Sequence, residues 1–493
     1  MRINTTKAIL LLLCLYAITK ANGQAGTFDS SFGLNGLVET DFTNIQSESA
    51  LRVLRQQDGK LVVLFNARGA SWLSRYFNNG TKDLNFTDYT EEQYNNGFIQ
   101  LQAGTAFQAS DLALQKNGNL LVAGNVKGDQ LDFSLVQHLP SGFTDNGFGN
   151  NGQVITSITP GQNDNATAMA IQQDGKIVVV GCTNTGSQRD FAIVRYNTDG
   201  SLDNTFSGDG KLTTDFNSGN DTALAVILQP DGKILVGGVS TANSSQKKSF
   251  ALARYNSNGT LDLTFSGDGK LTTDISMGDD VLKSLSLQSD GKILAGGYTT
   301  TGQTDFALVR YLSDGTLDNT FDGDGKLTTD IAQGSSDTLQ SIAVQGDGKI
   351  LAGGFTRSAR GYDFALVRYL SGGVMDPAFA TGGKNIADQG TPLDIANQMV
   401  LLQDGKILMA GQRGSDQTDL VVTRFTTTGL PDPTMLGNGR IVDHLKGSSI
   451  YYAMAIQRDG RIVAGGATSD VNTHGTHHDY ALARYLINGQ LDP

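Results

Sequence analysis

The sequence repeats itself at a nearly fixed period, and this repetition constrains the fold more than any local feature does. A tripeptide of the form Asp-Gly-Lys, or a close variant, begins at Asp58, Asn117, Asp174, Asp231, Asp290, Asp347, Asp404 and Asp459. Successive copies lie 59, 57, 57, 59, 57, 57 and 55 residues apart. Repeats of this length are single supersecondary units that bury their apolar faces by stacking on their neighbours. The sequence therefore predicts one repeat array rather than several unrelated domains.

One repeat can be divided into four strands. Residues 222–229 (TALAVILQ) are apolar on both alternating faces, as in a strand that is covered on both sides. The turn at 230–232 (PDG) joins them to 233–239 (KILVGGV), which completes a hairpin. The third and fourth strands are expected at 250–255 (FALARY) and 270–275 (KLTTDI). A helical interpretation fails because no segment keeps a 3.6-residue period and glycines recur throughout.

Stacked four-stranded sheets that are covered on both faces are typical of a β-propeller, in which each blade lies between two others. We therefore predict an all-β fold, an eight-bladed β-propeller of four-stranded repeats of about 57 residues, with residues 24–493 as one domain. A β-trefoil or another closed β array is the alternative. It is disfavoured because eight units do not divide into threes.

The two ends of the chain carry parts of the same motif. The segment 202–216 (LDNTFSGDGKLTTDF) connects two repeats, the C-terminus stops at the opening of that motif in 491–493 (LDP), and residues 27–42 carry it nearly complete. We therefore predict that an N-terminal strand at 36–42 closes the last blade as its outermost strand. The alternative is that the match is accidental and the chain is a fragment.

Residues 1–23 have the pattern of a secretory signal peptide. A basic start precedes an apolar run at 8–18, and small residues stand before a cleavage point ahead of Gln24. We expect export, with a final location that is extracellular, periplasmic or on the cell surface. An uncleaved anchor and a lipoprotein attached through Cys14 are the alternatives. The apolar run is too short to span a bilayer as a helix, and Cys14 lies inside it.

Removal of residues 1–23 would leave a more acidic chain with one cysteine. It takes away Arg2, Lys7 and Lys20 and no acidic residue, so the formal net charge changes from −12 to −15. This charge disfavours nucleic acids and anionic membranes as partners. Cys182 has no second cysteine with which to form an intramolecular disulfide. We expect no integral membrane segment after signal cleavage, and we expect a monomer.

Two motifs recur in order with the Asp-Gly-Lys hairpin. One is the third strand, which appears as DFAIVRY (190–196), DFALVRY (305–311 and 363–369) and DYALARY (479–485), and the other is the connection at 202–216, 261–275 and 317–331. Together these motifs resemble the delta-60 repeat, a family of bacterial secreted and surface proteins. The resemblance runs from about Phe28 to Pro493, although the first two repeats depart from it. It implies a propeller-like fold and export, and it implies no defined activity.

An acidic residue recurs ten positions before most of the turn aspartates. The eight positions are Glu48, Phe107, Asp164, Asp221, Asp280, Asp337, Asp394 and Ser449. If the strand that follows is the innermost of each blade, the six acids ring the mouth of the central channel and are candidate ligands for a metal ion such as calcium. The structural alternative is that each one caps a loop by accepting backbone N–H bonds, or pairs with an arginine of the third strand. No cofactor is predicted otherwise.

For two further sets of polar residues, a functional and a structural role must also be compared. Arginines recur in the third strand of seven of the eight repeats, and aspartates recur at its start in six; we predict that these are structural pairs. The arginines are Arg75, Arg195, Arg254, Arg310, Arg368, Arg424 and Arg484, and the aspartates are Asp132, Asp190, Asp305, Asp363, Asp419 and Asp479. His474, His477 and His478 are secondary candidates for a transition metal, and a solvated loop between the second and third strands is the alternative.

No constellation of residues demands a particular chemistry. A Gly-x-Ser-x-Gly nucleophile elbow and a phosphate-binding loop are both absent from the sequence. The second-to-third-strand connections differ from repeat to repeat, whereas the hairpin turns on the opposite face barely vary. Since recognition is usually carried by variable loops on a rigid scaffold, we predict an exported non-enzymatic scaffold that binds a glycan or a surface protein. The alternative is a divalent-cation-dependent propeller hydrolase or lyase that uses the acidic ring.

Overall fold

The computed structural model describes residues 37–40, 49–67, 70–77, 81–88, 97–101, 106–242, 246–358, 360–414, 418–435, 440–443, 448–457, 459–472 and 475–486. Every regular element in these ranges is a β-strand, so the predicted all-β class is confirmed. Among the same residues, no helix has the length and apolar character needed to cross a membrane. The predicted signal peptide at 1–23 lies outside the described residues.

The strands form sheets that repeat one plan, in which three long strands and one short strand follow each other in chain order. The first sheets contain β2 (Ser49–Arg55), β3 (Leu61–Ala67), β4 (Ala70–Tyr76) and β5 (Phe98–Gln100), then β6 (Ala106–Leu114), β7 (Leu120–Lys127), β8 (Leu131–His138) and β9 (Gln153–Thr156). Next come β10 (Asp164–Ile171), β11 (Ile177–Thr185), β12 (Gln188–Tyr196) and β13 (Lys211–Thr214), joined to β14 (Asn220–Leu228), β15 (Ile234–Thr241), β16 (Lys248–Tyr255) and β17 (Lys270–Thr273). A single parallel bridge between Arg189 and Asn220 makes these two units one eight-stranded sheet.

The second half of the chain continues the same plan. Its sheets contain β18 (Asp280–Leu287), β19 (Ile293–Thr300), β20 (Thr304–Tyr311) and β21 (Lys326–Thr329), then β22 (Asp337–Val344), β23 (Ile350–Ser358), β24 (Gly361–Tyr369) and β25 (Lys384–Ala387). They are followed by β26 (Ile395–Leu401), β27 (Ile407–Gly414), β28 (Thr418–Phe425) and β29 (Arg440–Asp443), and by β30 (Ser448–Ile456), β31 (Ile462–Asn472) and β32 (Gly475–Tyr485).

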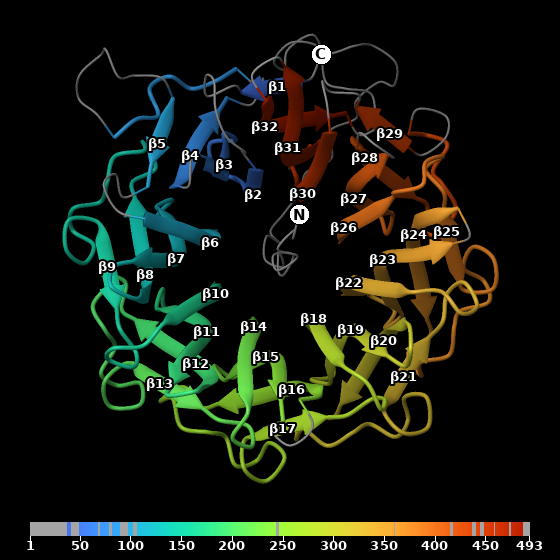
Figure 1. Cartoon of the computed structure of the whole chain (residues 1–493), viewed down its shortest axis with the longest axis horizontal. Helices are drawn as coiled ribbons and strands as arrows, with labels where there is room; N and C mark the ends of the chain where they lie inside the picture. Colours follow the sequence, from blue (N-terminus) through green and yellow to red (C-terminus); the bar gives the residue numbers. More distant parts are fainter. Residues whose placement is uncertain are drawn as a thin grey trace.

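The sheets stand side by side around a common centre, as in a β-propeller (Figure 1). The first strand of each unit lies nearest to that centre, and the short fourth strand lies at the outside. This arrangement explains why the sequence of the inner strands is apolar on both faces. Each sheet packs one face on the preceding unit and the other on the following unit.

The cores between neighbouring sheets are made of aliphatic and aromatic side chains from both. Leu235 and Leu252 of one unit, for example, pack with Leu282 and Leu285 of the next, and all four are buried. Gly237 lies at this contact, where an added Cβ would be 2.6 Å from a methyl carbon of Leu285. Close packing of this kind is the main favourable term in folding, since it removes apolar surface from water.

The first and last units of the chain are also in contact. β1 (Leu37–Thr40) pairs antiparallel with β32, from Leu37 opposite Ala483 to Thr40 opposite Tyr480. Val53 and Val63 of the first unit share one buried core with Val463 of the last. Residues far apart in the sequence therefore belong to one sheet and to one core.

Candidate functional site

The hairpin turns between the first and second strands form one face of the molecule, and they are nearly identical. In the turn at Asp231, the N–H of Gln229 donates to the carbonyl of Lys233, and the N–H of Gly232 donates back to Gln229. Gly232 has a φ of +83°, which glycine adopts without strain. The same two backbone bonds close the turns at Asp58, Asn117, Asp174, Asp290, Asp347, Asp404 and Asp459.

The recurrent arginines form ion pairs with aspartates on this turn face, but these are not the aspartates that were predicted. Arg195 Nε donates to Asp203 Oδ2 over 2.7 Å, and Asp203 belongs to the connection motif rather than to the start of the third strand. The prediction that the third-strand aspartates pair with these arginines is therefore wrong. The same pair recurs as Arg75–Asp83, Arg254–Asp262, Arg310–Asp318, Arg368–Asp376 and Arg424–Asp432.

The chain itself supplies partners to both oxygens of Asp203. Thr205 donates its hydroxyl to Asp203 over 2.6 Å, and Lys176 Nζ lies 2.9 Å from the same carboxylate. Burial alone would raise the pKa of Asp203, but the hydrogen bonds from Thr205 and Lys176 and the charge of Arg195 hold it below its ordinary value. The Arg195 guanidinium lies 4.5 Å from the ring centroid of Phe206. The turn face therefore has a structural role.

The sequence-predicted ring acids lie at the opposite end of the inner strands. Asp164, Asp221, Asp280, Asp337 and Asp394 stand at or beside the start of β10, β14, β18, β22 and β26, and each is completely buried. They therefore do not line the surface of a central channel. Glu48 lies outside the described residues.

One oxygen of each ring acid caps the loop that leads into its strand. Asp221 Oδ2 accepts the backbone N–H of Phe216 over 2.7 Å. The equivalent donors are Ile158 for Asp164, Ile275 for Asp280, Ile331 for Asp337 and Gln389 for Asp394. The structural alternative of loop capping is therefore confirmed. Within the part of the chain that the structure describes, no arginine forms an ion pair with these acids, so the arginine alternative is wrong.

At three of the junctions between neighbouring units, the ring acid lies close to two further aspartates. Asp190 comes from the third strand, Asp215 follows the fourth strand, and Asp221 begins the next unit. One carboxylate oxygen of each lies within 4.8 Å of the others. The same three positions bring together Asp305, Asp330 and Asp337, and Asp363, Asp388 and Asp394. We call these the three-aspartate junctions.

Burial and mutual repulsion disfavour the ionised carboxylates at these junctions. Burial raises the pKa of Asp221 to about 6, and the charges of Asp215 and Asp190 act in the same direction. Burial also raises the pKa of Asp394 to about 6, with a contribution from Asp363. The pKa of Asp190 is raised by burial and by Asp215. A cation or a proton relieves such a cluster.

Two other junctions hold fewer acids. Where Asp280 begins its unit, Ser249 stands in place of the third-strand aspartate, and Lys247 Nζ donates to the carboxylate of Asp274. Where Asp164 begins its unit, Asp132 is present, but Ser157 follows the fourth strand. The chain therefore varies the charge of this face from junction to junction, whereas the turn face repeats one arrangement.

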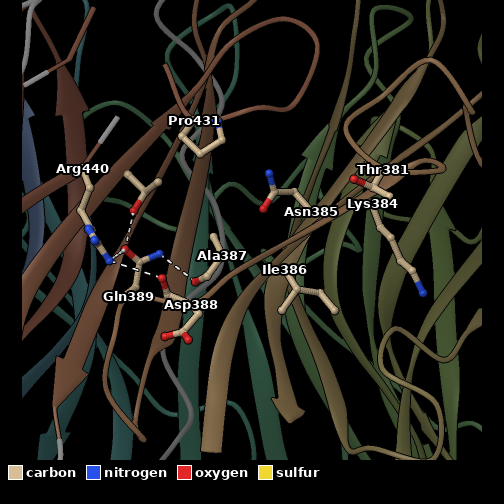
Figure 2. Close-up of a pocket in the computed structure, with 10 residues that line it drawn as sticks. Thr381, Lys384, Asn385, Ile386, Ala387, Asp388, Gln389, Pro431 and Arg440 are labelled. Atoms are coloured by element: carbon tan, nitrogen blue, oxygen red, sulfur yellow. Dashed lines mark hydrogen bonds between the residues drawn. The ribbon is translucent and has the colours of Figure 1, made fainter. Parts of the chain in front are cut away.

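A cavity of about 650 Å³ lies beside the third of the three-aspartate junctions. Its wall includes β25, the following Asp388 and Gln389, and Arg440 of β29 in the next sheet (Figure 2). Arg440 donates to the backbone carbonyl of Asp388 and to Oε1 of Gln389, each over 3.3 Å. Sequence reasoning missed this cavity because no motif marks an edge strand that lies against the next sheet.

The predicted variable loops are mostly strand. β11 and β12 pair up to Thr185 and Gln188, which leaves a two-residue turn, whereas β15 and β16 are separated by residues 242–247. β31 and β32 are each 11 residues long. His477 and His478 therefore belong to β32 rather than to a loop, which corrects the prediction for that segment, and His474 lies outside the described residues.

Comparison with known proteins supports a repeat β-propeller family. The model of a β-propeller domain of unknown function (DUF5122) matches six segments, at residues 172–206, 229–265, 288–321, 345–379, 402–434 and 457–493. The matched segments exclude the two repeats that depart most from the motifs, those with turns at Asp58 and Asn117. The delta-60 name stays a prediction. No curated protein matches the sequence.

Solved structures with similar chain paths include proteins of different kinds. A protein of unknown function from Dyadobacter fermentans has 13% identity and a TM-score of 0.36, over 76% of this chain and 94% of that one. The polysaccharide lyase Uly1 has 12% identity and a TM-score of 0.42, over 95% and 94% of the two chains. Drosophila Semaphorin 1b has 11% identity and a TM-score of 0.39, over 92% and 87%. At these values the likenesses carry no argument about activity.

Proposed function

We propose that this chain is an exported, non-enzymatic scaffold whose units close into one eight-bladed propeller and whose junction face binds a partner. By junction face we mean the face that holds the second-to-third-strand connections and the three-aspartate junctions. The pairing of β1 with β32 and the core shared by Val53 and Val463 support closure. The pattern of residues 1–23 supports export.

The difference between the two faces carries the proposal. On the turn face the same backbone bonds and the same arginine–aspartate pair recur in unit after unit. On the junction face the connections range from a two-residue turn after Thr185 to the six residues 242–247 between β15 and β16. A rigid scaffold that varies its connections on one face only is suited to recognition on that face.

The partner that we propose is a glycan or a surface protein. The formal net charge of −12 for the whole chain argues against nucleic acid and anionic membranes. The alternative function is that of a divalent-cation-dependent hydrolase or lyase. The three-aspartate junctions offer carboxylates for it, but they occur three times over. An active site is normally unique in a chain, so repetition favours the scaffold.

Blocking one face at a time tests this proposal. We would attach a bulky maleimide reagent to Ser187→Cys and Gln303→Cys on the junction face, and to the matched controls Gln173→Cys and Ser289→Cys on the turn face. All four residues are exposed, and the native Cys182 is buried. Binding to a panel of defined soluble polysaccharides and purified surface proteins should fall only with the junction-face labels. Equal loss from the turn-face labels would contradict the proposal. The mass of the exported chain tests cleavage before Gln24.

A further inference from the structure

We infer that Asp190, Asp215 and Asp221 together bind one Ca²⁺ ion at the junction between two units. This inference goes beyond the proposed function, because partner binding does not require a metal at this position. It assigns a ligand to a cluster whose members reach the junction from three separate parts of the chain.

The geometry suits a hard cation with oxygen ligands. One oxygen from each carboxylate lies within 4.8 Å of the other two. Calcium binds oxygens at about 2.3–2.6 Å, so oxygens on opposite sides of one ion are about 5 Å apart. The three oxygens can therefore contact a single ion without a rearrangement of the backbone.

An unsatisfied buried oxygen points to the ligand independently of the cluster. Asp190 is 8% exposed, and its Oδ1 is buried with no hydrogen-bond partner among the described residues. Its other oxygen accepts the hydroxyl of Thr185 over 2.7 Å. A buried carboxylate oxygen without a donor is unfavourable, and direct coordination of a cation removes that penalty.

In the described part of the chain, no lysine or arginine forms an ion pair with the three carboxylates of this cluster. Lys270 donates its ammonium to the backbone carbonyl of Asp215 over 2.5 Å, and its charge opposes the rise in the pKa of Asp190. It forms no ion pair with the three carboxylates within the described ranges. Lys326 and Lys211 make the same backbone bond at the junctions with fewer acids, to Asp274 and to Ser157. This lysine therefore recurs whether or not the third carboxylate is present.

The junction that lacks the third aspartate provides an internal comparison. There Ser249 replaces the aspartate, and Lys247 places its ammonium on Asp274 and donates to the carbonyl of Ser276. Where the acid is missing, the chain brings a cation of its own. Where Asp190 is present, the acidic cluster is complete and a cation from solution takes that role.

The donor set favours a hard, oxygen-binding cation such as calcium over zinc. The cluster has neither histidine nor cysteine, which zinc prefers. Asp215 is exposed, so water can complete the six to eight oxygen ligands of calcium. With three protein carboxylates, we expect a dissociation constant of about 10⁻⁴–10⁻³ M, in the range of extracellular calcium modules.

Counting bound calcium in matched variants tests the inference. The full chain, freed of metal by EDTA and dialysed at about pH 7.5, where a carboxyl of pKa near 6 is ionised, is titrated with Ca²⁺ by calorimetry. Asp190→Asn should remove one equivalent of bound ion. Asp132→Asn is the control, because its junction has only two acids, and it should remove none.

Three results would overturn the inference. They are no calcium uptake by the unaltered chain at about 10 mM, an unchanged number of bound ions in Asp190→Asn, and equal losses in both variants. If Asp190→Asn fails to fold, Asp215→Asn replaces it, since Asp215 is exposed and its substitution leaves the buried packing intact.

Discussion

The two faces of this propeller neutralise their buried acids in different ways. On the turn face, a buried aspartate of the connection motif meets an arginine. Asp203 meets Arg195, and the pKa of Asp203 is lowered. On the junction face, the buried aspartates meet one another, and the pKa of Asp221 rises to about 6. On the first face, the buried charges are compensated within the chain. The second face leaves charge to be compensated from solution, which is what a binding surface needs.

Breaking the arginine–aspartate pair on the turn face is expected to have the largest effect. Arg195→Met leaves Asp203 buried without its main partner, and loss of one member of a buried pair typically reduces the free energy of unfolding by about 3–5 kcal/mol. Both side chains are at most 4% exposed. Arg189→Met, in the same strand but exposed on the junction face, is the control and should change stability little. Urea unfolding compares the two, and equal effects would remove the distinction between the faces.

Crowding the contact between units on the turn face should have the next largest effect. Gly315 has a φ of +86°, and an added Cβ would lie 2.7 Å from the ring of Phe265 in the preceding unit. Gly315→Ala should therefore lose about 1–3 kcal/mol of unfolding free energy. Gly323, with a φ of +91° and no atom within 4 Å of an added Cβ, separates backbone strain from the clash. Thermal melts of the two alanine variants should show the smaller shift for Gly323→Ala.

The pH dependence of stability should separate the faces, because their pKa shifts have opposite signs. Asp221 has a folded pKa of about 6, above its unfolded value, so its contribution is present at low pH and is lost as pH rises through 6. Asp262, at about 2, contributes above its unfolded pKa and loses that contribution only as pH falls toward 2.

In EDTA, the free energy of unfolding should therefore decrease between pH 4.5 and 7.5, by about 1–2 kcal/mol after allowance for solvent screening. Asp221→Asn cannot ionise and should flatten this slope in urea titrations. An unchanged slope in Asp221→Asn would show that the junction acids do not control stability in this pH range.

The smallest expected change in stability accompanies a gain of binding. The double variant Lys247→Ser and Ser249→Asp removes the chain's own cation and restores the third carboxylate beside Asp274 and Asp280. It should bind one more calcium equivalent than the unaltered chain, by the same calorimetric titration. Lys247→Ser alone restores no carboxylate and serves as the control. A double variant that binds no further ion would show that three carboxylates are not sufficient.

The sequence predicted the repeat, its strands and the all-β class because these depend on local pattern. The alternation in 222–229 and the turn at Asp231 reappear as β14, β15 and their hairpin. The sequence did not predict which of the repeated side-chain positions come into contact. Asp190, Asp215 and Asp221 come from a third strand, the end of a fourth strand and the next first strand, so only the packing of two units brings them together. For the same reason the partner of Arg195 was assigned to the wrong aspartate.

The central claim is that the chain itself compensates the buried charges of the turn face, whereas ions from solution compensate those of the junction face. Locating the bound ions tests this claim most directly. Crystals of the full chain grown with Ca²⁺ or Tb³⁺ at about pH 7.5, above the pKa of Asp221, would be measured for anomalous scattering. The account predicts a peak among Asp190, Asp215 and Asp221, and none beside Asp203, where Arg195 is already bound. A map with no peak at the junction, or with peaks beside Asp203, would contradict it.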